Sequence, residues 1–302
     1  MDRPCRRQVT AMLHGLSLPR LARLGQMLAV ASGLATTALP ATAQSVQRVA
    51  SINMCTDQLL VDLARPEQIA GLSPFARDRT RSWIAAKAGR FPILSGTAEE
   101  ILVLKPDLVV AGSFTRRETR EFIRARRLHL EEFPVARTVA DARAQILRMA
   151  ALVGAEASGR ERAAALDAAM ERLGAAARGQ QLRVLPLARR GWVAGQDSIL
   201  TDLLRTAGLV NAAGRRAGGF MSLEEIVQLR PDAILVGRDD DRAEDQGRAM
   251  LLHPAIAALF PPERRILMSE TLTVCGGPML VEAIDNLARQ LSALGPRRAA
   301  PR

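Results

Sequence analysis

The chain has 302 residues, of which 48% are hydrophobic and 24% are charged, values typical of a globular protein and not of a disordered one. The formal net charge is +11, and arginine supplies nearly all of the positive charge. The basic residues are scattered and only 3% of residues are aromatic, which argues against a nucleic-acid partner. We interpret the excess positive charge as solvated surface residues. Some of it could also line a cleft that attracts anions.

Residues 1–43 have the organisation of a secretory signal peptide. Five arginines precede a mostly apolar run at 24–39, and residues 41–43 read Ala-Thr-Ala, an A-x-A cleavage site. The apolar run is too short and too rich in small residues for a membrane-spanning helix. The sequence therefore predicts an exported protein that is not embedded in the membrane. A disordered basic tail is the alternative, and the export route, Sec or twin-arginine, stays open.

Strands and helices alternate in the next part of the chain, the pattern of a parallel α/β sheet. We expect these elements to form an N-terminal lobe over 45–154. The expected strands are 46–54, 68–72, 108–111 and 128–133, and the expected helices begin near residues 55, 97, 115 and 138.

An alanine-rich, proline-free stretch from 156 to about 178 predicts one long helix, with Leu166, Met170 and Leu173 on one stripe. It is either one more surface helix or a rigid connector, and we assign residues 155–179 to a connecting backbone helix. Strand and helix patterns then resume over 180–294, which predicts a C-terminal lobe. Residues 295–302 are expected to be a disordered tail.

One sequence unit occurs twice, at 97–112 and 222–237. Both copies read hydroxyl-x-Glu-Glu-Ile-x-x-Leu-basic-Pro-Asp, followed by an apolar run and glycine. The hydroxyl residue and the second glutamate predict a capping box at a helix start, the proline ends the helix, and the apolar run reads as a buried strand. The first glutamates, Glu99 and Glu224, are left free to face solvent. The duplication predicts two similar lobes that present the same charge, although each glutamate alone also suits an ordinary helix start.

This ordered set of features resembles the substrate-binding proteins of ABC importers for iron–siderophore, cobalamin and haem, the helical-backbone (class III) type of periplasmic binding protein. The resemblance covers about residues 46–293. It implies an α/β fold of two Rossmann-like lobes that flank a cleft and are joined by a long rigid helix. It also implies capture of a metal chelate, a ferric siderophore or a cobalamin-type corrinoid, in that cleft.

The partners implied by the resemblance are the chelate and an ABC permease dimer with its ATPase subunits. The family's docking glutamates correspond to Glu99 and Glu224. A soluble monomer without a cofactor, a catalytic residue or a protein-bound metal is expected. The family does not fix the ligand, and the absence of tyrosine weighs against a tyrosine-ligated haem.

Ligands of parallel α/β sheets bind at the carboxyl ends of the strands. The loops expected there offer aromatic side chains for stacking and arginines for anionic oxygens. The expected ligand-binding residues are Asn53, Met54, Cys55, Thr56, Arg77, Trp83, Ser113, Phe114, Trp192, Gln196, Arg215, Arg216, Phe220, Cys275 and Gly276.

Cys55 and Cys275 are the two cysteines that would remain after signal-peptide removal. The sequence leaves three readings open: independent buried thiols, a disulfide that ties the lobes together, or soft contacts to a bound metal centre. His129 and His253, the remaining histidines, are too few and too scattered for a His-based zinc site.

Two other functions are compatible with an exported α/β protein. An exported enzyme lacks support, because the sequence contains no G-x-S-x-G, H-E-x-x-H, G-x-x-x-x-G-K-[ST] or G-x-G-x-x-G motif. An orphan ligand sensor without a transport role cannot be separated from an importer subunit on sequence.

Overall fold

The computed structural model of the protein describes residues 46–237 and 249–294. Contacts within the chain group residues 44–302 into one unit. The predicted signal peptide (1–43) and the predicted disordered tail (295–302) lie outside the described residues and stay predictions.

The first sheet has four parallel strands in the order β2-β1-β3-β4. The central strands β1 and β3 are buried along their whole length, as expected when helices cover both faces of a parallel sheet. The strands are β1 (Val49–Ser51), β2 (Ile69–Gly71), β3 (Leu108–Gly112) and β4 (Leu130–Phe133). The helices of this part are α1 (Met54–Leu63), α2 (Ala98–Leu104), α3 (Arg117–Ala125) and α4 (Val139–Val153).

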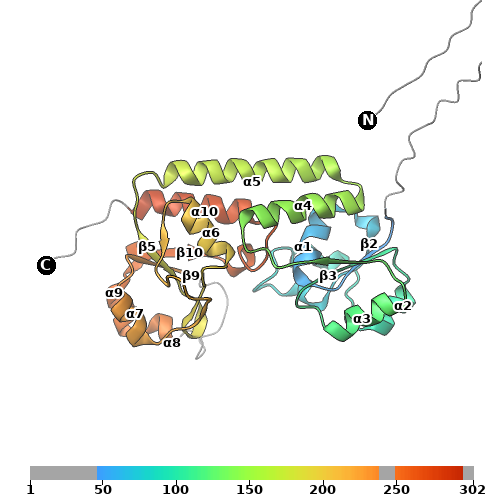
Figure 1. Ribbon diagram of the computed structural model, residues 1–302, viewed down its shortest axis with the longest axis horizontal. Coiled ribbons are helices and arrows are strands. Elements are labelled where there is room, and N and C mark those ends of the chain that lie inside the picture. The colour runs from blue at the N-terminus through green and yellow to red at the C-terminus, as the bar shows by residue number, and fades with distance from the viewer. Residues whose placement is uncertain (1–45, 238–248, 295–302) are drawn as a thin grey trace, which may run out of the picture. The chain divides into compact units, whose positions relative to one another are not determined.

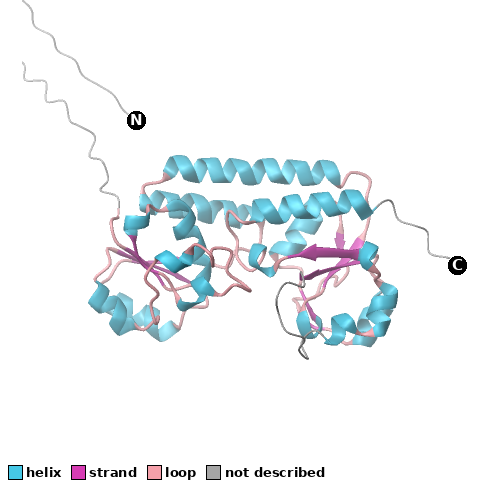
Figure 2. Cartoon of the chain, turned by 180° about the vertical axis from the view of Figure 1, so that it is seen from behind, coloured by secondary structure: helices cyan, strands magenta, loops and turns pink. Residues whose placement is uncertain are grey.

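The second sheet is also parallel, in the order β10-β9-β5-β7, and a short antiparallel ribbon, β6–β8, accompanies it. Figure 2 shows helices around both four-stranded sheets. The strands are β5 (Arg183–Pro186), β6 (Trp192–Val193), β7 (Val210–Asn211), β8 (Gly219–Phe220), β9 (Ala233–Gly237) and β10 (Arg265–Met268). The helices are α6 (Ile199–Thr206), α7 (Leu223–Leu229), α8 (Ala249–Leu252), α9 (Pro254–Leu259) and α10 (Leu280–Leu294). The predicted α/β fold with two similar sheets is confirmed.

The long helix α5 (Glu156–Ala176) lies along α4 and α10 (Figure 1). Leu166 and Leu173 of the predicted stripe are fully buried. Gly159 permits close approach to α4, because a Cβ at this position would lie 2.4 Å from the Cβ of Ala150. The helix therefore packs against one helix from each side of the chain, and it falls within the predicted connecting segment 155–179.

Ion pairs also join α5 to elements on both sides of it. Arg162 Nε donates to Asp62 Oδ2 of α1 at 3.0 Å, and the Arg172 guanidinium bridges both carboxylate oxygens of Asp285 on α10, at 2.9 and 3.0 Å. A single apolar cluster extends from α1 through α4 and α5 to α10. These contacts support the predicted role of α5 as a stiff connector.

The duplicated unit folds the same way twice, as helix α2 with strand β3 and as helix α7 with strand β9. Ser222 and Glu225 form the predicted capping box. The first copy differs: the Thr97 hydroxyl caps the backbone of Glu100, but the Glu100 carboxylate accepts hydrogen bonds from Ser95. The box predicted for the first copy was therefore half right, because Ser95 offers a competing pair of donors.

The ends of α2 and α7 are also equivalent. Lys105 and Arg230 are left-handed C-caps, each with φ of 47°, in place of the glycine common at such positions. The next acidic residue of each copy then accepts a backbone N–H at the start of the neighbouring strand. Asp107 Oδ2 accepts from Arg48 N at 2.9 Å, and Asp232 Oδ2 accepts from Arg183 N at 2.8 Å. The Pro-Asp pair thus ties each helix–strand unit to the central strand beside it.

Candidate functional site

A cavity of about 860 Å³ lies at the carboxyl edge of the first sheet. Residues that follow all four strands line it, as expected for a parallel α/β sheet. Seven predicted ligand-binding residues are among the lining residues: Asn53, Met54, Cys55, Ser113, Phe114, Cys275 and Gly276.

Aromatic side chains form much of the cavity wall. Phe114, after β3, is 86% exposed and Phe75, after β2, is 51% exposed, while Phe122 and Phe133 also line the cavity. Large apolar side chains this exposed indicate a binding surface when they gather in a concave site. The sequence analysis selects Arg77, two residues further along the chain, and misses Phe75.

Charged side chains line the same cavity. Arg81 and Arg116 supply two cations, and Glu99 and Glu118 supply two carboxylates. Arg81 Nη2 lies 2.9 Å from Asp78 Oδ2. Hydrogen bonds from Thr80, together with Arg81, hold the pKa of Asp78 at about 2, so this carboxylate is ionised at neutral pH. The sequence analysis does not include Arg81 and Arg116 among the ligand-binding residues, because neither comes directly after a strand.

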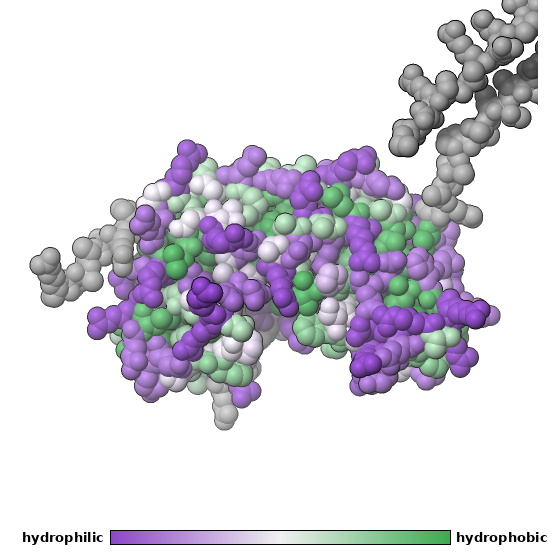
Figure 3. Space-filling view, in the orientation of Figure 1, coloured by the Kyte–Doolittle hydropathy of each residue, from purple (hydrophilic) through white to green (hydrophobic). Residues whose placement is uncertain are grey.

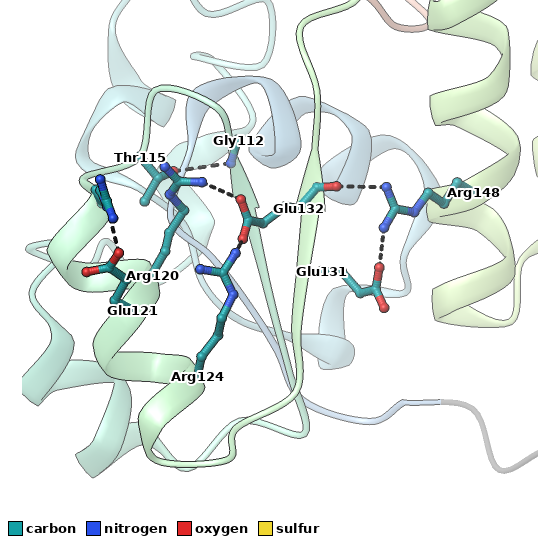
Figure 4. A network of polar contacts seen from close by, with 9 residues as sticks. Gly112, Thr115, Arg120, Glu121, Arg124, Glu131, Glu132 and Arg148 are labelled. Carbon is teal, nitrogen blue, oxygen red and sulfur yellow. Dashed lines mark hydrogen bonds and ion pairs between the residues drawn. The ribbon is translucent and has the colours of Figure 1, made fainter.

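The wall beside β4 is held by a polar network (Figure 4). Arg120 and Arg124 of α3 both pair with Glu132, and Arg148 of α4 pairs with Glu131. Arg148 Nη1 also donates to the backbone carbonyl of Glu132 at 2.7 Å. Helices on both sides thus fix the strand that leads into the lining residues 133–136.

Three predicted ligand contacts in the first half of the chain have structural roles instead. Thr56 is fully buried, and its hydroxyl contacts Ser51 Oγ at 2.8 Å and donates to Asn53 O at 2.9 Å. Arg77 donates to the carbonyls of Gly89 and Phe91, and Trp83 is half-buried against the core. None of the three lines the cavity.

The predicted ligand contacts of the second half lie on the β6–β8 ribbon or close to it in the sequence. Trp192 and Phe220 pack edge-on across the β6–β8 ribbon, with ring centroids 5.2 Å apart, and are 45% and 64% exposed. Arg216 pairs with Glu225 at 3.0 Å, and Arg215 and Gln196 are exposed nearby in the sequence. These five residues do not line the cavity, and their role as ligand contacts stays a prediction.

Cys55 and Cys275 form a disulfide across 220 residues of sequence. The readings as free buried thiols or as thiolate contacts to a metal are therefore wrong, and the two residues line the cavity as a disulfide. Sequence proximity could not have distinguished the three alternatives, since the pairing depends on the tertiary fold.

Asp57 of α1 is fully buried, and its carboxylate accepts hydrogen bonds from the backbone N–H and the hydroxyl of Ser73. It thereby holds the residues just before Phe75 against α1. Burial raises the pKa of Asp57 from an ordinary value of 3.8 to about 7, although hydrogen bonds from Ser51 and Ser73 act in the opposite direction.

We expect this carboxyl group to make stability fall as pH rises. The folded protein keeps the proton up to about pH 7, whereas the unfolded chain releases it near pH 3.8. The contribution of Asp57 is complete below pH 3.8 and is lost by about pH 7, at about 1.4 kcal/mol per pH unit between these limits. Asp57→Asn should therefore show a shallower fall of unfolding free energy over this range in urea titrations. Asp78→Asn is the matched control and should leave the slope unchanged; an unaltered slope in Asp57→Asn would contradict the assignment.

The histidines lie away from the cavity. His129 precedes β4, at the opposite end of that strand from the lining residues, and contacts Glu131 at 3.2 Å. His253 caps the start of α9. Within residues 46–237 and 249–294, no group of three or more His, Cys, Asp or Glu residues could hold a metal ion. Over the same ranges, no helix has the length and apolar character needed to cross a bilayer.

The fold is similar to those of several solved binding proteins. The periplasmic heme-binding protein RhuT from Roseiflexus sp. RS-1, in apo form, is 23% identical with a TM-score of 0.67, and the match covers 83% of this chain and 100% of that one. An ABC-type Fe3+-hydroxamate transport system protein from Saccharomonospora viridis DSM 43017 is 17% identical with a TM-score of 0.64, over 82% and 93% of the two chains. The periplasmic vitamin B12 binding protein BtuF of Vibrio cholerae is 15% identical with a TM-score of 0.59, over 82% and 98%.

No curated protein sequence matches the chain significantly. The sequence profile of the periplasmic binding protein family, in contrast, matches residues 49–259, more than two thirds of the chain. The match confirms the resemblance inferred from the duplicated units and removes the exported enzyme as an alternative. The chain belongs to the periplasmic binding protein family, whose members bind solutes and are not enzymes.

Proposed function

We propose that the protein captures a metal chelate, a ferric siderophore or a cobalamin-type corrinoid, in the periplasm and delivers it to an ABC permease dimer with its ATPase subunits. The observation that carries the proposal is the cavity at the carboxyl edge of the first sheet, where exposed phenylalanines lie with two arginines. The similar solved proteins include binders of haem and vitamin B12 and a hydroxamate transport protein, which supports this class of cargo.

The cavity suits a large ligand with both apolar and anionic parts. Its volume of about 860 Å³ lies toward the upper end of the ligand-site range, roughly 300–1,000 Å³. Phe75 and Phe114 offer broad apolar faces for a chelator's carbon skeleton. The guanidinium groups of Arg81 and Arg116 suit the oxygens of carboxylate, hydroxamate or catecholate groups.

The donor set favours a chelate whose metal is already fully coordinated by the chelator. The described lining residues include no histidine, the sequence contains no tyrosine, and the two lining cysteines are joined as a disulfide. Among the usual haem-iron ligand types, the described lining offers only Met54. The protein would then contact the outer atoms of the chelator and not the metal. On this argument, ferric siderophores and corrinoids are better candidates than haem, which takes an axial ligand from its protein.

Two observations support a periplasmic location. A signal peptide at residues 1–43, as the sequence predicts, would direct export. The Cys55–Cys275 disulfide fits an oxidising compartment such as the bacterial periplasm and is unusual in the cytosol.

Calorimetric titration of the purified protein without residues 1–43 tests the proposal. The probes are cyanocobalamin, cobinamide, a ferric trihydroxamate, a ferric tris-catecholate and haemin. We expect one siderophore or corrinoid to bind with micromolar or tighter affinity, and the metal-free chelator to bind more weakly. Binding of haemin alone would overturn the preference for a coordinatively complete cargo. Binding of none would overturn the proposed cargo class.

The permease contact can be tested separately through Glu99 and Glu224. Both side chains are exposed in the first turns of α2 and α7, and neither has an ion pair with a described residue. Rim charges of this kind mainly set orientation and association rate. We expect Glu99→Ala combined with Glu224→Ala to reduce chelate uptake in cells by roughly tenfold or more.

Ligand affinity must be measured beside uptake, because Glu99 also lines the cavity. Glu224→Ala alone should leave the dissociation constant unchanged. Glu263→Ala, at another exposed glutamate, is the matched control and should not alter uptake. Full uptake by the double variant would show that these glutamates do not dock the permease.

A further inference from the structure

The cavity belongs almost entirely to the first half of the chain. Its described lining residues lie between positions 52 and 145, with the exception of Val274, Cys275 and Gly276. This 274–276 segment follows a short turn at Glu270–Leu272 and precedes α10, so it is continuous with the second sheet through β10. It is therefore the place where the second half of the chain reaches the proposed ligand.

Helix α1 holds the segment at two adjacent points. Cys55, in the first turn of α1, is bonded to Cys275. Gln58, three residues further along, is fully buried, and its Nε2 lies 3.2 Å from Cys275 Sγ. The Oε1 atom of Gln58 accepts a hydrogen bond from Trp83 N at 3.2 Å, which fixes the orientation of the amide.

Packing also seats the segment against the start of α4. A Cβ on Gly276 would lie 2.3 Å from the Cβ of Ala136 and 3.0 Å from that of Ala142. Glycine at this position lets the backbone approach those alanines, and Ala136 itself lines the cavity. In this position Val274 is 43% exposed, which leaves an apolar side chain available to a ligand.

We propose that the Cys55–Cys275 disulfide is a positioning element of the ligand site. It fixes Val274 and Gly276 as a wall of the cavity, so that a chelate is bound tightly by the oxidised protein and weakly by the reduced one. The inference rests on the proposed function for its ligand. Holding the wall in place before binding reduces the ordering that binding would otherwise require, which is the general benefit of preorganisation.

The first arm of the test needs no ligand. Hydrogen–deuterium exchange is measured at residues 273–279 in the oxidised protein, in protein reduced with a phosphine and in Cys55→Ser with Cys275→Ser. We expect faster exchange of this segment in the two forms without the disulfide, by a larger factor than in α5. Equal exchange in all three forms would overturn the proposal.

The second arm measures dissociation constants for cyanocobalamin and the ferric trihydroxamate, at a temperature where circular dichroism shows every form folded. Loss of the disulfide should weaken binding tenfold or more, Val274→Ala should weaken it severalfold, and the phosphine should have no effect on the double serine variant. Binding within twofold in all forms would overturn the proposal. If the oxidised protein binds neither probe nor any other chelate of the panel, the proposed function fails, and the exchange arm alone decides the positioning role.

Discussion

Replacing Cys55 and Cys275 together with serine is expected to lower the free energy of unfolding by about 2–5 kcal/mol. The disulfide joins residues 220 apart, so it restricts a large part of the unfolded chain. It also joins α1 to the segment before α10. These two parts of the chain also belong to one apolar cluster, to which α5 contributes. Guanidinium denaturation of the oxidised protein and the variant, followed by circular dichroism, measures the difference.

The reduced wild-type protein is the control for the serine side chains. It should unfold at nearly the same denaturant concentration as the double variant, since both lack the cross-link. A single substitution is a poorer test, because it leaves an unpaired thiol at a nearly buried position. A difference below about 0.5 kcal/mol between oxidised protein and variant would mean that the cross-link adds little to global stability.

Removing the cavity's two arginines should have the largest effect on ligand binding. We expect Arg81→Ala and Arg116→Ala each to weaken binding of the chelate roughly 10- to 100-fold, because a hydrogen bond to a charged group contributes about 1.5–3 kcal/mol. The effect of Arg81 should be the smaller of the two, since Asp78 already neutralises part of its charge. Calorimetric titration of each variant with the chelate identified in the panel checks both expectations.

Neighbouring arginines provide matched controls for charge. Arg79 is exposed on the same loop as Arg81, and Arg117 follows Arg116 and pairs with Glu121 on the helix surface, but neither lines the cavity. Arg79→Ala and Arg117→Ala should bind the chelate as the wild-type protein does. Equal loss in all four variants would mean that net charge steers the ligand and that no particular arginine contacts it.

The surface bears on whether an effect comes from individual arginines or from the overall charge of the protein. Figure 3 shows hydrophilic residues over most of one face, with hydrophobic residues among them in smaller patches. The basic residues are also scattered along the sequence, without a run of arginines. Any effect limited to Arg81 and Arg116 would therefore come from their position in the cavity.

Part of the site could be predicted because strand ends can be recognised locally. Asn53, Ser113 and Phe114 come directly after buried strands, and the rule that parallel sheets bind ligands at this edge selects them correctly as cavity residues. The same rule selected Thr56, which lies in the first turn of α1 and is buried. Proximity in sequence to a strand end does not decide which way a side chain points.

The remaining differences arise from turns and from packing between distant segments. The short turn at Pro74–Arg77 places Phe75 in the cavity and Arg77 against the carbonyls of Gly89 and Phe91. The exposed pair of Trp192 and Phe220 packs across the β6–β8 ribbon and does not line this cavity, so its ligand contact stays a prediction. No periodicity or spacing in the sequence encodes these directions.

The sequence by itself determined the two helix–strand units, the long helix between them and hence the family. Each of these rests on interactions between residues a few positions apart: Thr97 and Ser222 cap their helices, and Leu166 and Leu173 share one buried stripe. Only the tertiary structure decided that Cys55 and Cys275 are bonded and that one lobe supplies nearly the whole cavity. Both features depend on contacts between segments far apart in the sequence, 220 residues for the disulfide, and the packing of α4 and α10 on α5 brings such segments together.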